Sequence, residues 1–162
     1  MGVSCVWHFM ILHEHHIKTT CIVGIGNPLR SDDGIGAYVC TLIEEKKLPG
    51  LHAITTQQLD TGMLEELTGF NRVLFIDAAV NTKKISIQPI SKENAQPQSF
   101  SHHINVAMLA GLAEQLYAAK TQFYVCAIPV QNFELGNTLS KTAKKNAAAA
   151  AALIGKWVAS NN

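Results

Sequence analysis

Residues 19–36 combine a predicted strand, a glycine turn and a helix start, and this combination restricts the possible folds. Cys21-Ile22-Val23 is an apolar run typical of a strand that is buried on both faces of a sheet. The glycines of Gly24-x-Gly26 let the backbone turn sharply and approach a ligand closely. Asp32-Asp33 follows, just before apolar residues at helical spacing. If one of these carboxylates caps the helix, the other is free for chemistry.

Apolar runs with strand character alternate with segments of helical spacing along the rest of the chain. We expect further strands at 51–57, 72–77, 84–90 (an edge strand) and 122–130. We expect helices at 34–47, 63–67, after His103, and to about 158 behind a cap at Thr138 or Ser140. This alternation predicts an α/β fold, a single-domain three-layer sandwich with a mostly parallel sheet and helices on both faces.

The 162 residues suit one domain, which we place at 19–162 behind an N-terminal extension at 1–18. The formal net charge of +1 gives no electrostatic footprint for nucleic acid or an anionic membrane. No apolar run approaches the roughly 20 residues that span a bilayer. Residues 1–12 are apolar but lack the basic start and cleavage site of a signal peptide, so we expect a soluble cytoplasmic protein.

The cysteines and the histidine-rich segment offer weaker sites. The four cysteines form no Cys-x-x-Cys pair, and three lie in apolar runs, which indicates a reducing compartment and small hydrophobic side chains. A cysteine nucleophile is the alternative, although no histidine lies in a partner motif. His13-Glu14-His15-His16 could bind a metal but is not the His-Glu-x-x-His zinc signature, and we prefer to interpret it as a solvated extension.

Three potential metal ligands follow predicted strands or precede a predicted helix. Asp33 lies in the first loop, Asp77 ends the strand at 72–77, and His103 lies where a loop enters a helix. Ligands of parallel sheets bind beyond the carboxyl ends of the strands. Two carboxylates and one imidazole suit zinc or nickel and leave coordination positions open for water or substrate.

Each of these residues has a plainer explanation. Asp32 or Asp33 could only cap a helix, Asp77 could bind a ribose or complete a turn, and His102 or His103 could lie on the surface. Asp60-Thr61-Gly62 could be a simple turn or line the same cleft. The dinucleotide motif G-x-G-x-x-G fails because Leu29 stands at its third glycine. The sequence also lacks a phosphate-loop lysine and a G-x-S-x-G elbow.

The segment 24–36, Gly-Ile-Gly-Asn-Pro-Leu-x-x-Asp-Asp-Gly-Ile-Gly, resembles the opening motif of the hydrogenase maturation proteases. These endopeptidases remove a C-terminal extension from the large subunit of nickel–iron hydrogenases. The resemblance runs from about Thr20 to the last helix. It continues through Asp60-Thr61-Gly62, Phe75-Ile76-Asp77-Ala78, Ser101-x-His103 and the segment 128–136.

The resemblance implies a metal-binding site made of Asp33, Asp77 and His103, with both carboxylates also taking part in catalysis. With Asp33 assigned to this site, we expect Asp32 to cap the helix. It implies substrate binding by Gly26, Asn27, Asp60, Thr61 and Gly62. The partner would be a nickel–iron hydrogenase large-subunit precursor that carries its own nickel, and the isolated protein could hold zinc or another divalent metal. A metal could polarise the scissile carbonyl or generate hydroxide, and a carboxylate could act as base. The alternatives are a non-cleaving nickel-dependent assembly factor and a small-molecule metallohydrolase.

Overall fold

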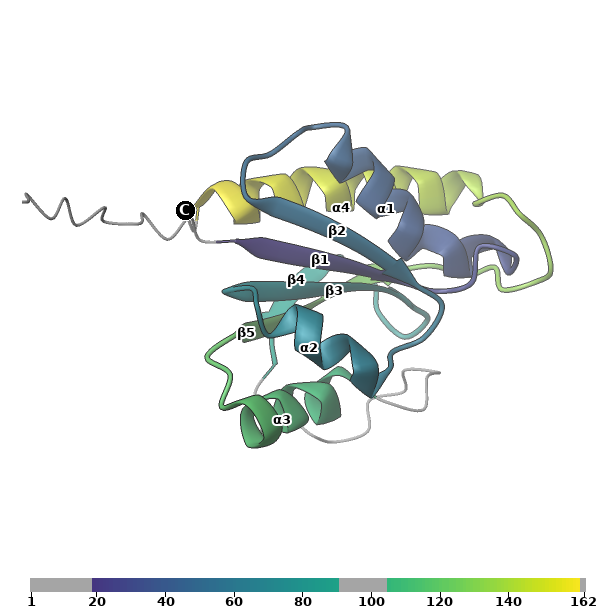
Figure 1. The fold of residues 1–162 in the computed structure, drawn as a ribbon. Helices are drawn as coiled ribbons and strands as arrows, with labels where there is room; N and C mark the ends of the chain where they lie inside the picture. The colour runs from purple at the N-terminus through teal and green to yellow at the C-terminus, as the bar shows by residue number, and fades with distance from the viewer. Residues whose placement is uncertain (1–18, 91–104, 161–162) are drawn as a thin grey trace, which may run out of the picture.

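The computed structural model describes residues 19–90 and 105–160, which form a sheet between two layers of helices (Figure 1). In chain order the elements are β1 (Thr20–Ile25), the 3-10 turn η1 (Ser31–Gly34), α1 (Ile35–Glu44), β2 (Leu51–Thr56), the 3-10 turn η2 (Thr61–Met63), α2 (Leu64–Leu67), β3 (Arg72–Ala79), β4 (Ser86–Pro89), α3 (Val106–Tyr117), β5 (Gln122–Pro129) and α4 (Lys141–Ser160). The predicted α/β sandwich is confirmed.

The described residues contain one five-stranded sheet with the order β2-β1-β3-β5-β4. The first four strands in this order are parallel, and β4 pairs with β5 in the antiparallel sense. β4 lies at the edge of the sheet, as its alternating sequence predicts. In the centre, β1 and β3 are in register, with Gly24 opposite Ile76.

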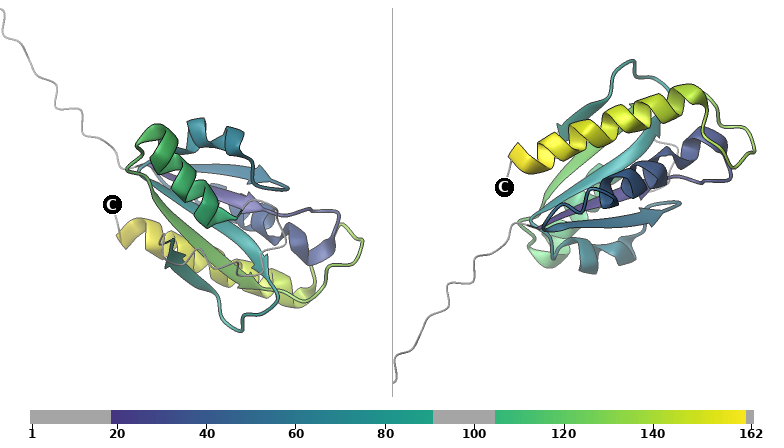
Figure 2. Two further views of the ribbon diagram at one scale, coloured as in Figure 1. Left: turned by 90° about the horizontal axis from the view of Figure 1, so that it is seen from below. Right: turned by 90° about the horizontal axis from the view of Figure 1, so that it is seen from above.

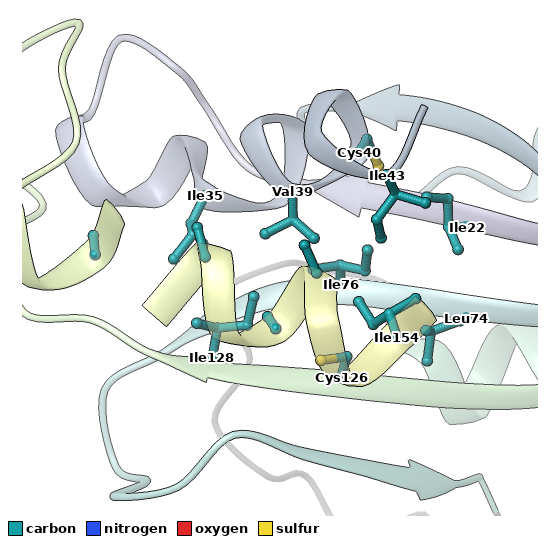
Figure 3. Packing of buried hydrophobic residues seen from close by; sticks show 14 of the residues in the cluster. Ile22, Ile35, Val39, Cys40, Ile43, Leu74, Ile76, Cys126, Ile128 and Ile154 are labelled. Carbon is teal, nitrogen blue, oxygen red and sulfur yellow. The ribbon is translucent and has the colours of Figure 1, made fainter. Parts of the chain in front are cut away.

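Two hydrophobic clusters hold the helices on the two faces of the sheet. α1 and α4 cover one face, and α2 and α3 cover the other (Figure 2). Alternate residues of each central strand point into different clusters, which explains why these strands are apolar throughout. Figure 3 shows the first cluster, with α1 and α4 meeting over the sheet; its labelled members are Ile22, Ile35, Val39, Cys40, Ile43, Leu74, Ile76, Cys126, Ile128 and Ile154.

The alanine-rich sequence of α4 lets this helix pack closely. Its buried face contains Ala143, Ala147, Ala150 and Ala151, each at most 3% exposed, together with Ile154. Small side chains bring the α4 backbone near α1 and β5, which α4 contacts. Ser140 caps α4, because its hydroxyl accepts a hydrogen bond of 3.1 Å from the N–H of Ala143. The structure thus selects Ser140 from the two predicted caps.

The order in which the chain adds strands to the sheet reverses at β1. It passes from β1 through α1 to β2 on one side, then through α2 to β3 on the other side of β1. The carboxyl ends of β1 and β3 therefore flank a topological switch point, where open α/β sheets bind their ligands. The loop after β1 carries Asp33, and Asp77 lies near the end of β3.

Some predictions lie outside the described residues. These are the extension 1–18 with its histidine cluster, and the segment 91–104 with His102 and His103. Within residues 19–90 and 105–160, no helix is long and apolar enough to cross a membrane.

Candidate functional site

Asp33 is held in the loop between β1 and α1. Its side chain is 6% exposed, and its Oδ2 accepts a hydrogen bond of 2.8 Å from the main-chain N–H of Asn27. The Asn27 side chain in turn accepts one of 2.9 Å from the N–H of Leu29. Asn27, predicted to bind substrate, thus has a first role in shaping the loop that presents Asp33.

The two glycines of this loop are explained by contacts within the protein. A Cβ on Gly26 would lie 1.8 Å from the carbonyl oxygen of Asp33, and Gly26 has φ +132°, a conformation that L-residues rarely adopt. A Cβ on Gly24 would lie 2.4 Å from the carbonyl oxygen of Gly36 in α1. The loop and helix already fill the space beside these two glycines. Packing within the protein therefore explains why both positions are glycine, and the predicted approach of a ligand to Gly26 stays a prediction.

Asp77 is a buried carboxylate near the carboxyl end of β3. Its side chain is 5% exposed, and its Oδ1 accepts a hydrogen bond of 2.8 Å from the N–H of Ala78. A carboxylate buried to this degree is uncommon unless it is paired or functional. The strand therefore fixes Asp77 at the switch point with little freedom of rotation.

Asp33 and Asp77 lie at the same edge of the sheet, on elements that touch. η1, which contains Asp33, contacts β3. Gly36, at the start of α1, lies against the main chain of Ile25 in β1 and of Ile76 in β3, so close that a Cβ would meet the Ile76 carbonyl oxygen at 2.7 Å. The structure thus places the two carboxylates of the predicted site on contacting elements at one edge of the sheet.

Asp32 does not cap the first helix, contrary to the prediction. The N-caps of η1 and α1 are Arg30 and Gly34, and neither makes a side-chain capping hydrogen bond. The Asp32 side chain is 1% exposed and turns toward the distant start of α4, where it binds Ser140. Sequence alone gave no signal for this contact, because the two residues are 108 positions apart.

The Asp60-Thr61-Gly62 segment forms a capped turn. Asp60 is the N-cap of η2, and its Oδ1 accepts a hydrogen bond of 2.6 Å from the N–H of Gly62. All three residues are exposed. This is the plainer of the two predicted roles, and the exposed Thr61 side chain leaves the substrate-binding role as a prediction.

The third predicted ligand, His103, lies outside the described residues. Within 19–90 and 105–160, no three His, Cys, Asp or Glu side chains form a group that could hold a metal ion. The described site supplies the two carboxylates, Asp33 and Asp77, whose oxygen donors are chemically suited to a divalent metal. A site for zinc or nickel with three protein ligands rests on His103 and stays a prediction.

The described cysteines are poor nucleophiles. Cys21, Cys40 and Cys126 are fully buried free thiols. Burial raises the pKa of each from 9.0 to about 12, and Glu66 adds to the effect at Cys21. Since the thiolate is the reactive form, these thiols are inert at neutral pH. The prediction that they serve as small hydrophobic side chains is confirmed.

The fold and the position of the carboxylates define an open α/β protein with an acidic site at its switch point. No protein-family model matches the sequence, and no curated protein matches it either. Solved structures share the fold over nearly the whole chain, and those with a stated function are hydrogenase maturation peptidases or endopeptidases.

Three of these structures define the likeness. The [NiFe] hydrogenase maturation protease HycI from Thermococcus kodakarensis is 21% identical, with a TM-score of 0.67 over 86% of this chain and 91% of that one. The hydrogenase maturating endopeptidase HybD from E. coli is 18% identical, with a TM-score of 0.66 over 89% and 94%. The hydrogenase 2 maturation peptidase from a Thaumarchaeota archaeon is 18% identical, with a TM-score of 0.66 over 88% and 99%. The chain therefore has the fold of the maturation proteases.

Proposed function

We propose that this protein is a hydrogenase maturation endopeptidase, which removes the C-terminal extension of a nickel–iron hydrogenase large-subunit precursor after nickel insertion. The observation that carries the proposal is the position of Asp33 and Asp77, two buried carboxylates at the switch point of a fold shared with solved maturation proteases. The opening motif at 24–36 supports it independently of the fold.

In this proposal the nickel belongs to the substrate. The precursor's own cysteines hold the ion, and Asp33 and Asp77 offer carboxylate oxygens to its open coordination positions. His103 is the third proposed ligand, by its place in the Ser-x-His motif. Contact with the ion fixes the precursor's tail against the carboxyl edge of the sheet, where Gly26, Asn27 and Asp60-Thr61-Gly62 lie around it.

Hydrolysis then requires an activated water and a polarised carbonyl. The metal supplies one of these functions, since a bound divalent ion lowers the pKa of water or withdraws charge from a carbonyl oxygen. A carboxylate of Asp33 or Asp77 accepts the proton of the attacking water, and the leaving amine of the extension takes up a proton. A serine or cysteine nucleophile has no place in this scheme, and the inert thiols of Cys21, Cys40 and Cys126 agree with it.

The proposal is tested by the mass of the hydrogenase large subunit in cells that lack this protein. We expect a precursor that keeps its extension, and restoration of the mature mass by the wild-type gene but not by one encoding Asp33→Asn. A large subunit of mature mass in the deletion strain would overturn the proposal.

The purified protein distinguishes the two alternative functions. An assembly factor would bind the nickel-loaded precursor without shortening it, whereas the endopeptidase releases the extension as a peptide that mass spectrometry detects. A small-molecule metallohydrolase would hydrolyse small amides and would ignore the extension.

A further inference from the structure

Two adjacent carboxylates in this chain face different partners. Asp33 accepts a hydrogen bond from Asn27 within its own loop, whereas Asp32 is turned toward the start of α4. Asp32 Oδ1 accepts a hydrogen bond of 2.7 Å from the N–H of Ser140, and Oδ2 accepts one of 2.9 Å from the Ser140 hydroxyl. Oδ2 also accepts one of 3.2 Å from the N–H of Asn132. The buried charge is thus met by three hydrogen bonds from one segment.

Main-chain hydrogen bonds join the same two loops beside this carboxylate. The N–H of Asp32 donates to the carbonyl of Asn132 at 2.9 Å, and the N–H of Ser31 donates to the carbonyl of Gly136 at 2.8 Å. The N–H of Gly136 donates back to the carbonyl of Leu29 at 3.0 Å. The loop that carries Asp33 is therefore held from outside, by the segment between β5 and α4.

The charge of Asp32 also suits its position. α4 is 20 residues long, and Ser140 is its N-cap, so Asp32 lies beside the positive end of the helix macrodipole. Hydrogen bonds to a charged acceptor are stronger than neutral ones. The Asp32 carboxylate is 1% exposed, and donors from the segment between β5 and α4 surround it.

The loop carrying Asp33 is fixed at two points that are close in sequence. On one side the Asp33 carbonyl lies against Gly26, and the Asn27 N–H binds the Asp33 carboxylate. On the other side Asp32 is fixed to Ser140. Because one peptide unit separates Asp32 from Asp33, a rotation that released Asp32 would also turn the Asp33 carboxylate away from its place at the switch point.

From this geometry we infer that Asp32 and Ser140 form a positioning pair, which orients Asp33 for the reaction. This inference rests on the proposed function for its kinetic consequence. Both residues act through Asp33 in this inference. The pair sets the direction of the Asp33 carboxylate and thereby affects the rate of the chemical step. Misplacement of a reacting group by about 1 Å can lower the rate about 100-fold.

The test compares Asp32→Asn and Ser140→Ala with wild type. In Asp32→Asn an amide nitrogen takes the place of one carboxylate oxygen, so that a donor faces the N–H of Asn132 or Ser140. Ser140→Ala removes the hydroxyl that donates to Asp32. Ser140→Thr keeps a hydroxyl and is the conservative rescue. Thr121→Val is the matched control, because it removes a partly buried 2.8 Å hydrogen bond to the carbonyl of Phe70 at the opposite edge of the sheet.

Two readouts separate positioning from stability. Steady-state cleavage of nickel-loaded precursor gives kcat and KM, and hydrogen exchange measured by NMR follows the Asn27 N–H that binds Asp33. For Asp32→Asn and Ser140→Ala we expect kcat to fall about 10- to 100-fold with little change in KM. We expect the Asn27 N–H to exchange about tenfold faster relative to the core amides of β1. Ser140→Thr and Thr121→Val should keep wild-type values of both.

The inference is overturned if Asp32→Asn and Ser140→Ala lower only the unfolding temperature, as Thr121→Val does, and leave kcat and Asn27 exchange unchanged. Failure of the proposed function is a different result, in which the wild-type protein releases no peptide from the precursor. Asn27 exchange would still decide, without any activity, whether Asp32 and Ser140 hold Asp33 in place.

Discussion

The carboxylate of Asp33 accepts a 2.8 Å hydrogen bond from the main-chain N–H of Asn27, six residues earlier, and this bond closes the loop that follows β1. An asparagine at position 33 could accept the same hydrogen bond through its amide oxygen but would lack the charge. For Asp33→Asn we therefore predict a protein that folds normally and cleaves precursor at least about 100-fold more slowly, because the proposed mechanism needs the Asp33 carboxylate at the reacting atoms. Cleavage is followed by the mass of the large subunit.

The control for this variant is Glu65→Gln, which removes a charge from the exposed first turn of α2. It should cleave at the wild-type rate. A cleavage rate for Asp33→Asn close to that of Glu65→Gln would show that the Asp33 charge has no part in the reaction.

Two glycine substitutions should change stability in opposite directions. Gly26→Ala places a Cβ within 1.8 Å of the Asp33 carbonyl oxygen at φ +132°, and backbone strain of this kind alone costs about 1–3 kcal/mol. Gly111→Ala, inside α3, meets no atom within 4 Å and should stabilise the protein by about 0.5–1 kcal/mol. Urea unfolding measures both. Equal free energies of unfolding for the two variants would contradict the loop structure.

The buried thiols predict a loss of stability at high pH. Burial raises the pKa of Cys126 from 9.0 to about 12, so in this window the folded protein keeps a proton that the unfolded chain has lost. The free energy of unfolding therefore falls as pH rises from 9 to 12, by up to about 1.4 kcal/mol per pH unit for each such thiol. Cys126→Val should show a shallower fall than wild type in urea unfolding from pH 8 to 11.

Ile128→Val is the control for the thiol variant, because it also changes a fully buried side chain of β5 but removes no titrating group. Its free energy of unfolding should fall with pH as steeply as that of wild type. The same slope for Cys126→Val would show that this thiol does not titrate in the window.

Arg72 is a buried cation whose removal should cost little. It is 5% exposed, its guanidinium lies 4.7 Å from the centre of the Trp157 ring, and Nη2 donates a 2.8 Å hydrogen bond to the Thr20 hydroxyl. Nε and Nη1 lack hydrogen-bond partners among the described residues, and burial lowers the pKa of Arg72. Arg72→Met, which removes the buried charge, should leave the free energy of unfolding unchanged or raise it.

Thr20→Val should have the opposite effect, because it leaves the guanidinium of Arg72 without its hydrogen-bond partner at a residue that is 1% exposed. We expect a loss of about 1–3 kcal/mol in thermal or urea unfolding. A larger loss for Arg72→Met than for Thr20→Val would mean that the cation–π contact with Trp157 outweighs the cost of burying the charge.

Much of the fold could be predicted from sequence because the central strands are apolar throughout. Cys21-Ile22-Val23 and the run ending at Asp77 are buried on both faces of the sheet, and continuous apolar runs are typical of such strands. The position of Asp77 could be predicted for the same reason, since a carboxylate that ends a buried strand has to lie at the sheet edge. The local sequence pattern was sufficient to predict burial and position wherever these depend only on the strand or helix that contains the residue.

The roles of Asp32 and Gly24 could not be predicted, because distant segments set them. Asp32 binds Ser140, 108 positions later, and a capping role within its own helix was the natural local interpretation. The space beside Gly24 is filled by α1, at Gly36, and only the packing of the helix on the strand shows this. Contacts of this kind leave no periodic signal in a single sequence.

In the proposed function, cleavage depends on the nickel of the substrate. The most direct measurement offers the purified protein two preparations of one large-subunit precursor, nickel-loaded and nickel-free, and follows release of the C-terminal extension by mass spectrometry. We expect the nickel-loaded precursor to be shortened and the nickel-free precursor to keep its full mass. Cleavage of both preparations at the same rate would contradict it.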